Sequence, residues 1–168
     1  EEFITELNDS KQMSQKKREK FYEIIKSKAR AIATCFIDEK KIDEINILNA
    51  TKLAMQNCLK DILQICKADI LLIDGNFLID ANIKQKSVVK GDAKSASIAS
   101  ASIIAKVERD RFMEKLDCKY PVYGFKDHKG YGSKTHIDAI KKYGPCEIHR
   151  KSFSPVSDFF SKQMELGI

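Results

Sequence analysis

The sequence predicts an α/β fold, in which strands alternate with helices along a chain of 168 residues. Two short apolar runs, residues 70–73 (ILLI) and 87–89 (SVV), end at Asp-Gly and Lys-Gly-Asp and are typical of buried strands. Longer segments with apolar residues at helical spacing precede and follow them. Alternation of this kind indicates helices packed on a sheet.

The N-terminal half contains no glycine before Gly75, so polar residues delimit its elements. Ser14 is expected to cap a helix that runs to about Arg30, and residues 31–37 (AIATCFI) are expected to form a strand. Asp38 should begin a short acidic helix, which a longer helix over residues 47–65 follows.

The C-terminal half is expected to be mostly helical. Ser95 or Ser97 can cap a helix of small residues that runs to about residue 116, and its alanines and serines permit close packing. Residues 121–133 are expected to form a loop rich in Tyr, Gly and Lys. Ser133 should cap a further helix that stops at Gly144-Pro145.

Composition is that of an ordinary globular protein, with 43% hydrophobic and 32% charged residues. No run is long and apolar enough to span a membrane, and the first residues do not form a secretion signal. The five cysteines are odd in number and none forms a C-x-x-C pair, which argues against disulfides and a zinc site. A cytoplasmic location with reduced thiols is therefore expected.

The net charge of +6 is concentrated in one part of the chain. Residues 84–151 hold sixteen Lys and Arg against eight Asp and Glu, a surplus that exceeds the whole-chain total. Such a basic segment indicates an anionic partner such as a phosphate backbone. A solvated, lysine-rich surface explains the same surplus, and charge alone does not choose between the two.

Two carboxylates, Asp74 and Asp92, follow the two expected strands, each beside a glycine. Sites in open α/β sheets form at the carboxyl ends of strands, and two acidic side chains brought together there could share a hard cation such as Mg²⁺. The alternative is structural, because Asp74 can open an Asp-Gly turn and Asp92 can cap the following helix.

Six blocks, in order across nearly the whole chain, resemble successive motifs of bacterial ribonuclease HII. They are LNDSK (residues 7–11), EINILNATKLAM (44–55), LLIDGN (71–76), VVKGDAKSASIASASIIAKVERDR (88–111), YGFKDHKGYGSKTH (123–136) and GPCEIHRKSFSPV (144–156). The resemblance implies a ribonuclease H-like mixed sheet flanked by helices. Residues 1–168 would then be a single, N-terminally incomplete domain, with a helical part from about residue 133.

The resemblance also implies a metal site that this chain contains only in half. Four acidic residues of the family hold two metal ions, Mg²⁺ or Mn²⁺, and Asp74 and Asp92 match the third and fourth. The first two are an adjacent Asp-Glu in a D-E-x-G-R-G motif, which is not found in these residues. The Gly-Arg-Gly turn of that motif reads the ribose 2′-hydroxyl. The first strands of the sheet are expected to be absent too, and the chain alone is expected to be poorly stable and inactive.

Other residues are candidates for substrate contacts. Tyr131, in HKGYGS, matches a family tyrosine that stacks on the deoxyribose after the scissile junction, although it could be an ordinary loop tyrosine. Lys94 and Ser95 begin the small-residue helix, where they could bind a phosphate or simply cap the helix. Lys11 could touch a backbone phosphate. The three histidines show no ligand spacing and are interpreted as ordinary loop and helix residues.

The implied activity is hydrolysis of the RNA strand of RNA–DNA hybrids and cleavage 5′ of ribonucleotides embedded in duplex DNA, by a two-metal mechanism that leaves 5′-phosphate products. In it Asp74 and Asp92 are metal ligands. The expected partners are such hybrids and duplexes, with no membrane, and the protein is expected to be a monomer. The alternative is a non-catalytic nucleic-acid-binding remnant, which keeps the basic segment but cannot cut.

Overall fold

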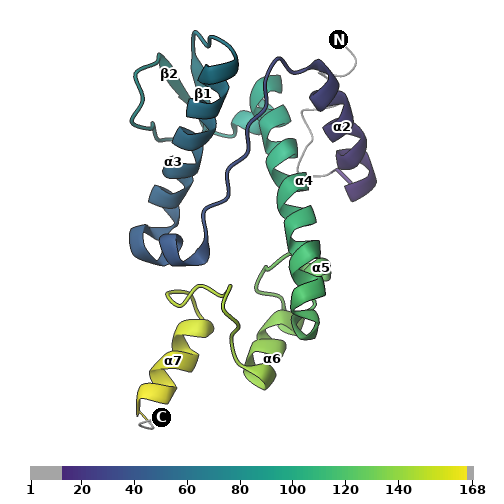
Figure 1. The fold of residues 1–168 in the computed structure, drawn as a ribbon, viewed down its shortest axis with the longest axis vertical. Coiled ribbons are helices and arrows are strands. Elements are labelled where there is room, and N and C mark those ends of the chain that lie inside the picture. The colour runs from purple at the N-terminus through teal and green to yellow at the C-terminus, as the bar shows by residue number, and fades with distance from the viewer. Residues whose placement is uncertain (1–12, 166–168) are drawn as a thin grey trace. The chain divides into compact units, whose positions relative to one another are not determined.

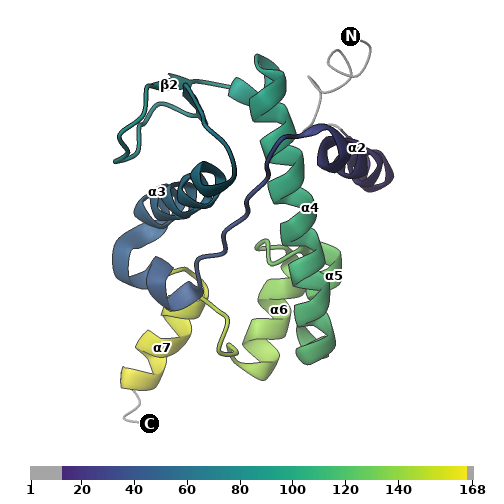
Figure 2. The same cartoon turned by 45° about the horizontal axis from the view of Figure 1, so that its top comes forward.

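The computed structural model of this chain describes residues 13–165 (Figures 1 and 2). Its principal elements are α2 (Gln15–Lys28), α3 (Glu39–Ile65), β1 (Leu71–Asp74), β2 (Gln85–Val88), η1 (Gly91–Ala93), α4 (Ala96–Lys119), η2 (Pro121–Tyr123), α5 (Phe125–His128), α6 (Lys134–Tyr143) and α7 (Val156–Glu165). The chain divides into two compact units. The first comprises the residues up to Phe36 together with Lys52–Glu108, and the second comprises Ile37–Thr51 together with the residues from Arg109 onward.

In the first unit, α2 packs along the first part of α4 (Figures 1 and 2). Ser14 caps α2 as the sequence predicts, because its Oγ accepts the Lys17 N–H at 3.3 Å. The buried residues of this contact are Met13, Phe21, Tyr22, Ile25, Ala99, Ile103, Ile104 and Val107. Ala99 is fully buried, which agrees with close packing on the small-residue face of α4. Each large side chain buried here contributes roughly 1.5–3 kcal/mol.

The sheet of the first unit consists of two parallel strands, β1 and β2, among the residues that the structure describes. Asp74 of β1 is in register with Val88 of β2. Leu59 of α3 and Ile73 of β1 are buried together in a separate small cluster, which half-buried side chains such as Phe77 extend. Both strands are therefore confirmed, although β2 begins two residues earlier than its apolar run because backbone pairing does not require apolar side chains.

Residues 31–37 are not a strand, so this sequence prediction is wrong. No other described segment forms a ladder with them, and a strand is stabilised by hydrogen bonds to a neighbour. Their apolar side chains are used in packing instead, since Ile32 lies against the α2–α4 core. Cys35 accepts a hydrogen bond from the Asn57 side chain at 3.5 Å.

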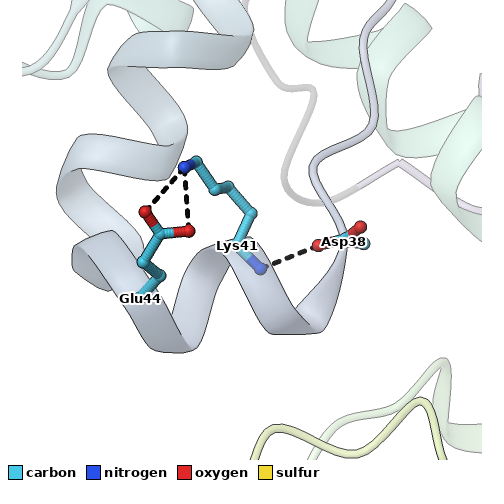
Figure 3. Close-up of polar contacts among 3 residues, drawn as sticks. All are labelled: Asp38, Lys41 and Glu44. Atoms are coloured by element: carbon cyan, nitrogen blue, oxygen red, sulfur yellow. Dashed lines mark hydrogen bonds and ion pairs between the residues drawn. The ribbon is translucent and has the colours of Figure 1, made fainter.

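Helix α3 is two helices joined at a kink, as the sequence predicts. Asn46 has the non-helical angles φ 65° and ψ 166°, and its Oδ1 accepts the Asn49 N–H at 3.1 Å, which caps the second helix. The first helix begins at an equivalent cap, where Asp38 Oδ1 accepts the Lys41 N–H at 2.7 Å (Figure 3). An exposed ion pair between Lys41 and Glu44 at 2.8 Å adds little to stability (Figure 3).

The second unit has a core of its own. The segment expected to be an irregular loop, residues 121–133, contains η2 and α5, so that prediction is corrected. The glycine-rich signal is real, but it marks the ends of these short helices, since Gly124 adopts a left-handed φ of 72° between them. The buried residues of this core are Met113, Tyr123, Phe125, Ala139, Ile140 and Val156.

Helix α6 begins and ends where the sequence predicts. Ser133 Oγ accepts the His136 N–H at 3.3 Å at its start, and Gly144, with φ 76°, follows its last residue. Asp43, at the start of α3, also belongs to this unit. Its carboxylate accepts the Lys151 N–H at 2.6 Å and bonds to the backbone and hydroxyl of Ser152.

None of the described helices has an apolar stretch sufficient to cross a membrane. The five cysteines are free thiols in this structure.

Candidate active site

The first candidate ligand, Asp74, is the last residue of β1. Its neighbour Gly75 donates its N–H to the Val88 carbonyl at 3.1 Å, so pairing with β2 continues one residue beyond the strand. Strand alternation buries Ile73 and turns Asp74 outward, where its side chain is exposed. The sheet therefore presents this carboxylate at the carboxyl edge, as the sequence predicts.

The chain that leaves β2 returns to the same carboxylate. Lys90 adopts a left-handed φ of 56°, which turns the backbone into η1. The first residue of η1, Gly91, donates its N–H to Asp74 Oδ1 at 2.8 Å. The next residue is Asp92, which is only 4% exposed. The residue that donates to Asp74 is thus the sequence neighbour of Asp92.

Gly91 leaves no room for a side chain at this point. A Cβ added to it would lie 2.6 Å from Cδ1 of Ile98 and 3.3 Å from Asp74 Oδ1. The glycine of the Lys-Gly-Asp sequence therefore lets the turn approach the carboxylate of Asp74 closely without displacing Ile98.

The donor set at this edge fits a hard divalent cation. Asp74 and Asp92 offer carboxylate oxygens, which Mg²⁺ and Mn²⁺ prefer over nitrogen or sulfur. Among the side chains that the structure describes, no group of three or more His, Cys, Asp or Glu is arranged to hold a metal ion. Two carboxylates could supply only part of a metal site, and the role of Asp74 and Asp92 as metal ligands stays a prediction.

The residues expected to bind phosphate lie just after η1. The Lys94 ammonium donates to the Val89 carbonyl at 2.8 Å, on the return path from β2. Ser95 is half-buried, and its N–H donates to the Gly91 carbonyl at 2.8 Å. Both residues therefore stabilise the turn that carries Asp92, and their contact with a phosphate stays a prediction. Lys11 lies outside the described residues.

Tyr131, the candidate for sugar contact, lies in the second unit on the short loop of residues 129–133, named here the Tyr131 loop. Tyr131 is 59% exposed, and the Arg109 guanidinium lies 5.9 Å from the centroid of its ring. The preceding residues are well anchored. Lys129 pairs with Glu114 at 2.6 Å, and its carbonyl accepts a hydrogen bond from Arg109 at 3.2 Å.

The three histidines, interpreted from the sequence as ordinary loop and helix residues, are brought together behind this loop. The rings of His128 and His136 stack with centroids 4.3 Å apart, and Nε2 of His136 lies 3.0 Å from Nε2 of His149. Nδ1 of His136 lies 2.9 Å from the Tyr131 carbonyl. Sequence spacing could not reveal this cluster, since the residues come from α5, α6 and the segment between α6 and α7.

Burial decides the charge of two of these rings. His136 is 6% exposed and His149 is 9% exposed. Burial lowers the pKa of His149 to about 4, and the neighbouring His136 and His128 rings add to this. Burial also lowers the pKa of His136. At neutral pH both rings are therefore uncharged.

Comparison with known proteins assigns the family. The ribonuclease HII family profile matches residues 4–156. Ribonuclease HII of Acetivibrio thermocellus is 57% identical over 152 residues, which cover 90% of this chain and 59% of the relative. The enzyme of Bacillus anthracis is 51% identical over 160 residues, or 95% of this chain and 61% of the relative. The chain thus spans about three-fifths of the length of these relatives.

Solved structures agree on the fold. A ribonuclease H2 from Pyrococcus horikoshii OT3 matches with a TM-score of 0.68 at 24% identity, over 95% of this chain and 82% of that one. A ribonuclease HII from Archaeoglobus fulgidus, solved in complex with PCNA, matches with a TM-score of 0.67 at 23% identity, over 92% and 82%. The ribonuclease H-like α/β fold expected from the sequence is confirmed, and the chain belongs to the ribonuclease HII family.

Proposed function

We propose that the protein containing this chain is a metal-dependent endonuclease, which hydrolyses the RNA strand of RNA–DNA hybrids and cuts 5′ of ribonucleotides embedded in duplex DNA. The observation that carries the proposal is the hydrogen bond of 2.8 Å from the Gly91 N–H to Asp74 Oδ1, which joins Asp74 to the turn that carries Asp92. Family membership supports the nuclease class.

Each residue of the site has a defined task in this proposal. Asp74 and Asp92 hold the cation, Mg²⁺ or Mn²⁺, and the Gly91 N–H fixes the orientation of the Asp74 carboxylate. A bound divalent cation lowers the pKa of water and stabilises charge on a leaving oxygen. Tyr131 stacks its exposed ring on the deoxyribose that follows the cut, while Lys94, Ser95 and Lys11 contact phosphates. Free cysteines fit a reducing cytosol.

A second function is favoured by one specific observation. These 168 residues contain no Asp-Glu-x-Gly-Arg-Gly motif, which in the family supplies two further carboxylates and the reader of the 2′-hydroxyl. Two carboxylates alone should hold Mg²⁺ weakly, since that ion demands near-octahedral oxygen geometry. Residues 1–168 by themselves would then bind nucleic acid without cutting it.

A cleavage assay separates the two functions. The substrate is a DNA duplex that carries one ribonucleotide, incubated with Mg²⁺ or Mn²⁺ and either residues 1–168 or the full-length protein that contains them. The endonuclease proposal expects cleavage 5′ of the ribonucleotide by the full-length protein and at most trace cleavage by residues 1–168. Absence of cleavage by the full-length protein would favour the binding function.

Substitution of Asp74 tests the metal-ligand role. In the full-length protein, Asp74→Asn should lower cleavage by at least about 100-fold, a loss of the size found when an electrostatic group of a site is removed. Binding to the duplex should persist. The matched control is Asp69→Asn, because Asp69 is an exposed carboxylate just before the same strand. Unchanged turnover in Asp74→Asn would refute the role of Asp74.

Salt dependence tests the basic segment. If about five phosphates are neutralised, the log–log slope of affinity against salt should be roughly −4 to −5. A nearly flat titration would identify the surplus charge of residues 84–151 as a solvated surface.

A further inference from the structure

The Tyr131 loop is tied to histidines through both backbone groups of Tyr131. Its N–H donates to the His128 carbonyl at 2.9 Å, and its own carbonyl lies 2.9 Å from Nδ1 of His136. The carbonyl also accepts the Ser133 N–H at 2.8 Å. The backbone beneath the exposed ring is therefore fixed from behind, while the ring faces solvent.

The position of each proton in this arrangement follows from the acceptors. A carbonyl oxygen cannot donate, so Nδ1 of His136 carries the proton and Nε2 of the neutral ring is an acceptor. Nε2 of His149, 3.0 Å away, must then be the donor. Nδ1 of His149 is left as an acceptor, and the Cys146 N–H supplies its hydrogen bond at 3.0 Å. The result is one chain of hydrogen bonds, all donated in the same direction, from the Cys146 N–H through the rings of His149 and His136 to the Tyr131 carbonyl.

The surroundings keep the two histidine rings of this hydrogen-bond chain uncharged. Both rings are buried, and burial lowers the pKa of each. The thiol of Cys146, whose pKa burial raises, lies 3.1 Å from the same Nδ1 of His149 and stays uncharged. If Nε2 of His136 were protonated, it would face the N–H of His149, and two donors cannot form a hydrogen bond. A charged His136 ring would therefore break the series of hydrogen bonds.

His128 forms a second, parallel support. Its Nε2 lies 2.8 Å from the Tyr123 carbonyl and therefore carries the proton, which leaves Nδ1 to accept the Gly130 N–H at 3.2 Å. The ring stacks on His136 at an interplanar angle of 14°. Both histidines therefore hold backbone groups of adjacent residues of the same loop.

We propose that His136, oriented by His149, is a positioning residue, which holds the Tyr131 loop in the conformation that presents the Tyr131 ring to the substrate. The inference rests on the proposed function, because it takes Tyr131 as the residue that contacts the sugar. Neither histidine touches the substrate in this proposal.

Two substitutions of His136 separate positioning from simple packing. The side-chain amide of Asn can place a donor where Nδ1 stands, whereas that of Gln reaches the position of Nε2. His136→Asn should therefore retain the bond to the Tyr131 carbonyl, and His136→Gln should lose it. A role in packing alone would instead favour the larger Gln.

Amide hydrogen exchange in the full-length protein tests whether His136 holds the Tyr131 loop in place. His136→Gln should speed exchange at the Tyr131 and Ser133 amides by about 2- to 10-fold, the range for loss of one net hydrogen bond. His136→Asn should remain close to wild type, and amides of α2 should be unchanged in both. Equal exchange in the two variants, or uniform acceleration across the second unit, would overturn the proposal.

A double-mutant cycle, measured on cleavage of a duplex with one ribonucleotide, tests whether His136 affects cleavage through Tyr131. Tyr131→Ala should lower kcat/KM by about 5- to 150-fold, the range for loss of one stacked base or sugar. His136→Gln should lower it by about 2- to 10-fold. The double variant should be no worse than Tyr131→Ala, because His136 acts only through Tyr131. Tyr143→Ala, which removes an exposed tyrosine from the end of α6, is the control and should leave kcat/KM unchanged.

The failures of the two proposals are distinguishable. If Tyr131→Ala cleaves as well as wild type, the assigned role of Tyr131 is wrong, while hydrogen exchange still reports whether His136 orders the loop. If Tyr131→Ala is impaired and His136→Gln lowers kcat/KM by its full factor in that background too, His136 acts independently of Tyr131 and the positioning proposal is wrong.

Discussion

Acidification from pH 7 to about 4.5 should destabilise the protein through His149. The pKa of this ring is about 4 in the folded state, because the ring is buried beside His136, and 6.5 is its ordinary value. Between these values the unfolded chain takes up a proton that the folded chain refuses, so stability falls as pH falls. At about 1.4 kcal/mol per pKa unit, the loss at pH 4.5 is roughly 2–3 kcal/mol.

The groups that face His149 do not cancel this effect. Burial raises the pKa of the Cys146 thiol and of the Tyr123 phenol, so both stay neutral throughout this pH range. Burial lowers the pKa of His136, so its titration destabilises in the same direction. His128, the remaining neighbour, contributes to the depression of the His149 pKa.

Urea denaturation at a series of pH values measures the loss, with His149→Gln as the matched variant. Gln cannot titrate, but its amide can still donate to His136 at the position of Nε2. The difference in unfolding free energy between wild type and variant should shrink by roughly 2–3 kcal/mol between pH 7 and 4.5. A constant difference, or an NMR titration of His149 near 6.5, would refute the reasoning.

The remaining predictions concern three other residues. Asp43→Asn should lower the free energy of unfolding by about 1 kcal/mol at pH 7, because it weakens the hydrogen bonds that Ser152 and its neighbour donate to the carboxylate. Burial raises the pKa of Asp43, but these hydrogen bonds outweigh it and leave the pKa lowered. That difference in unfolding free energy should disappear in urea titrations as pH falls through the lowered pKa. Ser133→Ala should cost about 1 kcal/mol in thermal unfolding, since the α6 cap is lost. Gly91→Ala should cost about 1–3 kcal/mol and impair cleavage, because its Cβ would collide with Ile98.

Local signals in the sequence predicted most of the elements. Ser14 and Ser133 cap helices as expected because an N-cap is decided by one side chain and the backbone three residues on. The prediction for residues 31–37 failed because a strand needs a partner, which an apolar run does not specify. The short helices η2 and α5 were missed because glycines that end one element and begin another resemble those of a loop.

In the candidate site, too, local features could be predicted from the sequence and long-range packing could not. Asp74 and Asp92 could be singled out because each lies near the end of a predicted strand beside a glycine. In the structure the N–H of Gly91, the residue before Asp92, donates to Asp74, and their role as metal ligands stays a prediction. The chain of hydrogen bonds through His136 and His149 could not be predicted. It depends on the packing of α6 against a distant irregular segment, for which thirteen residues of separation provide no periodic signal.

The two cores differ in how far apart in the chain their members lie, and this has a consequence for the order of folding. The α2–α4 core joins Tyr22 to Glu108, 86 residues apart. The second core, from Met113 to Val156, draws on one continuous stretch. Because loop closure slows the formation of distant contacts, the second core should be able to assemble first. During synthesis, however, α2 leaves the ribosome well before α4, so α2 would wait in the growing chain for its partner helix.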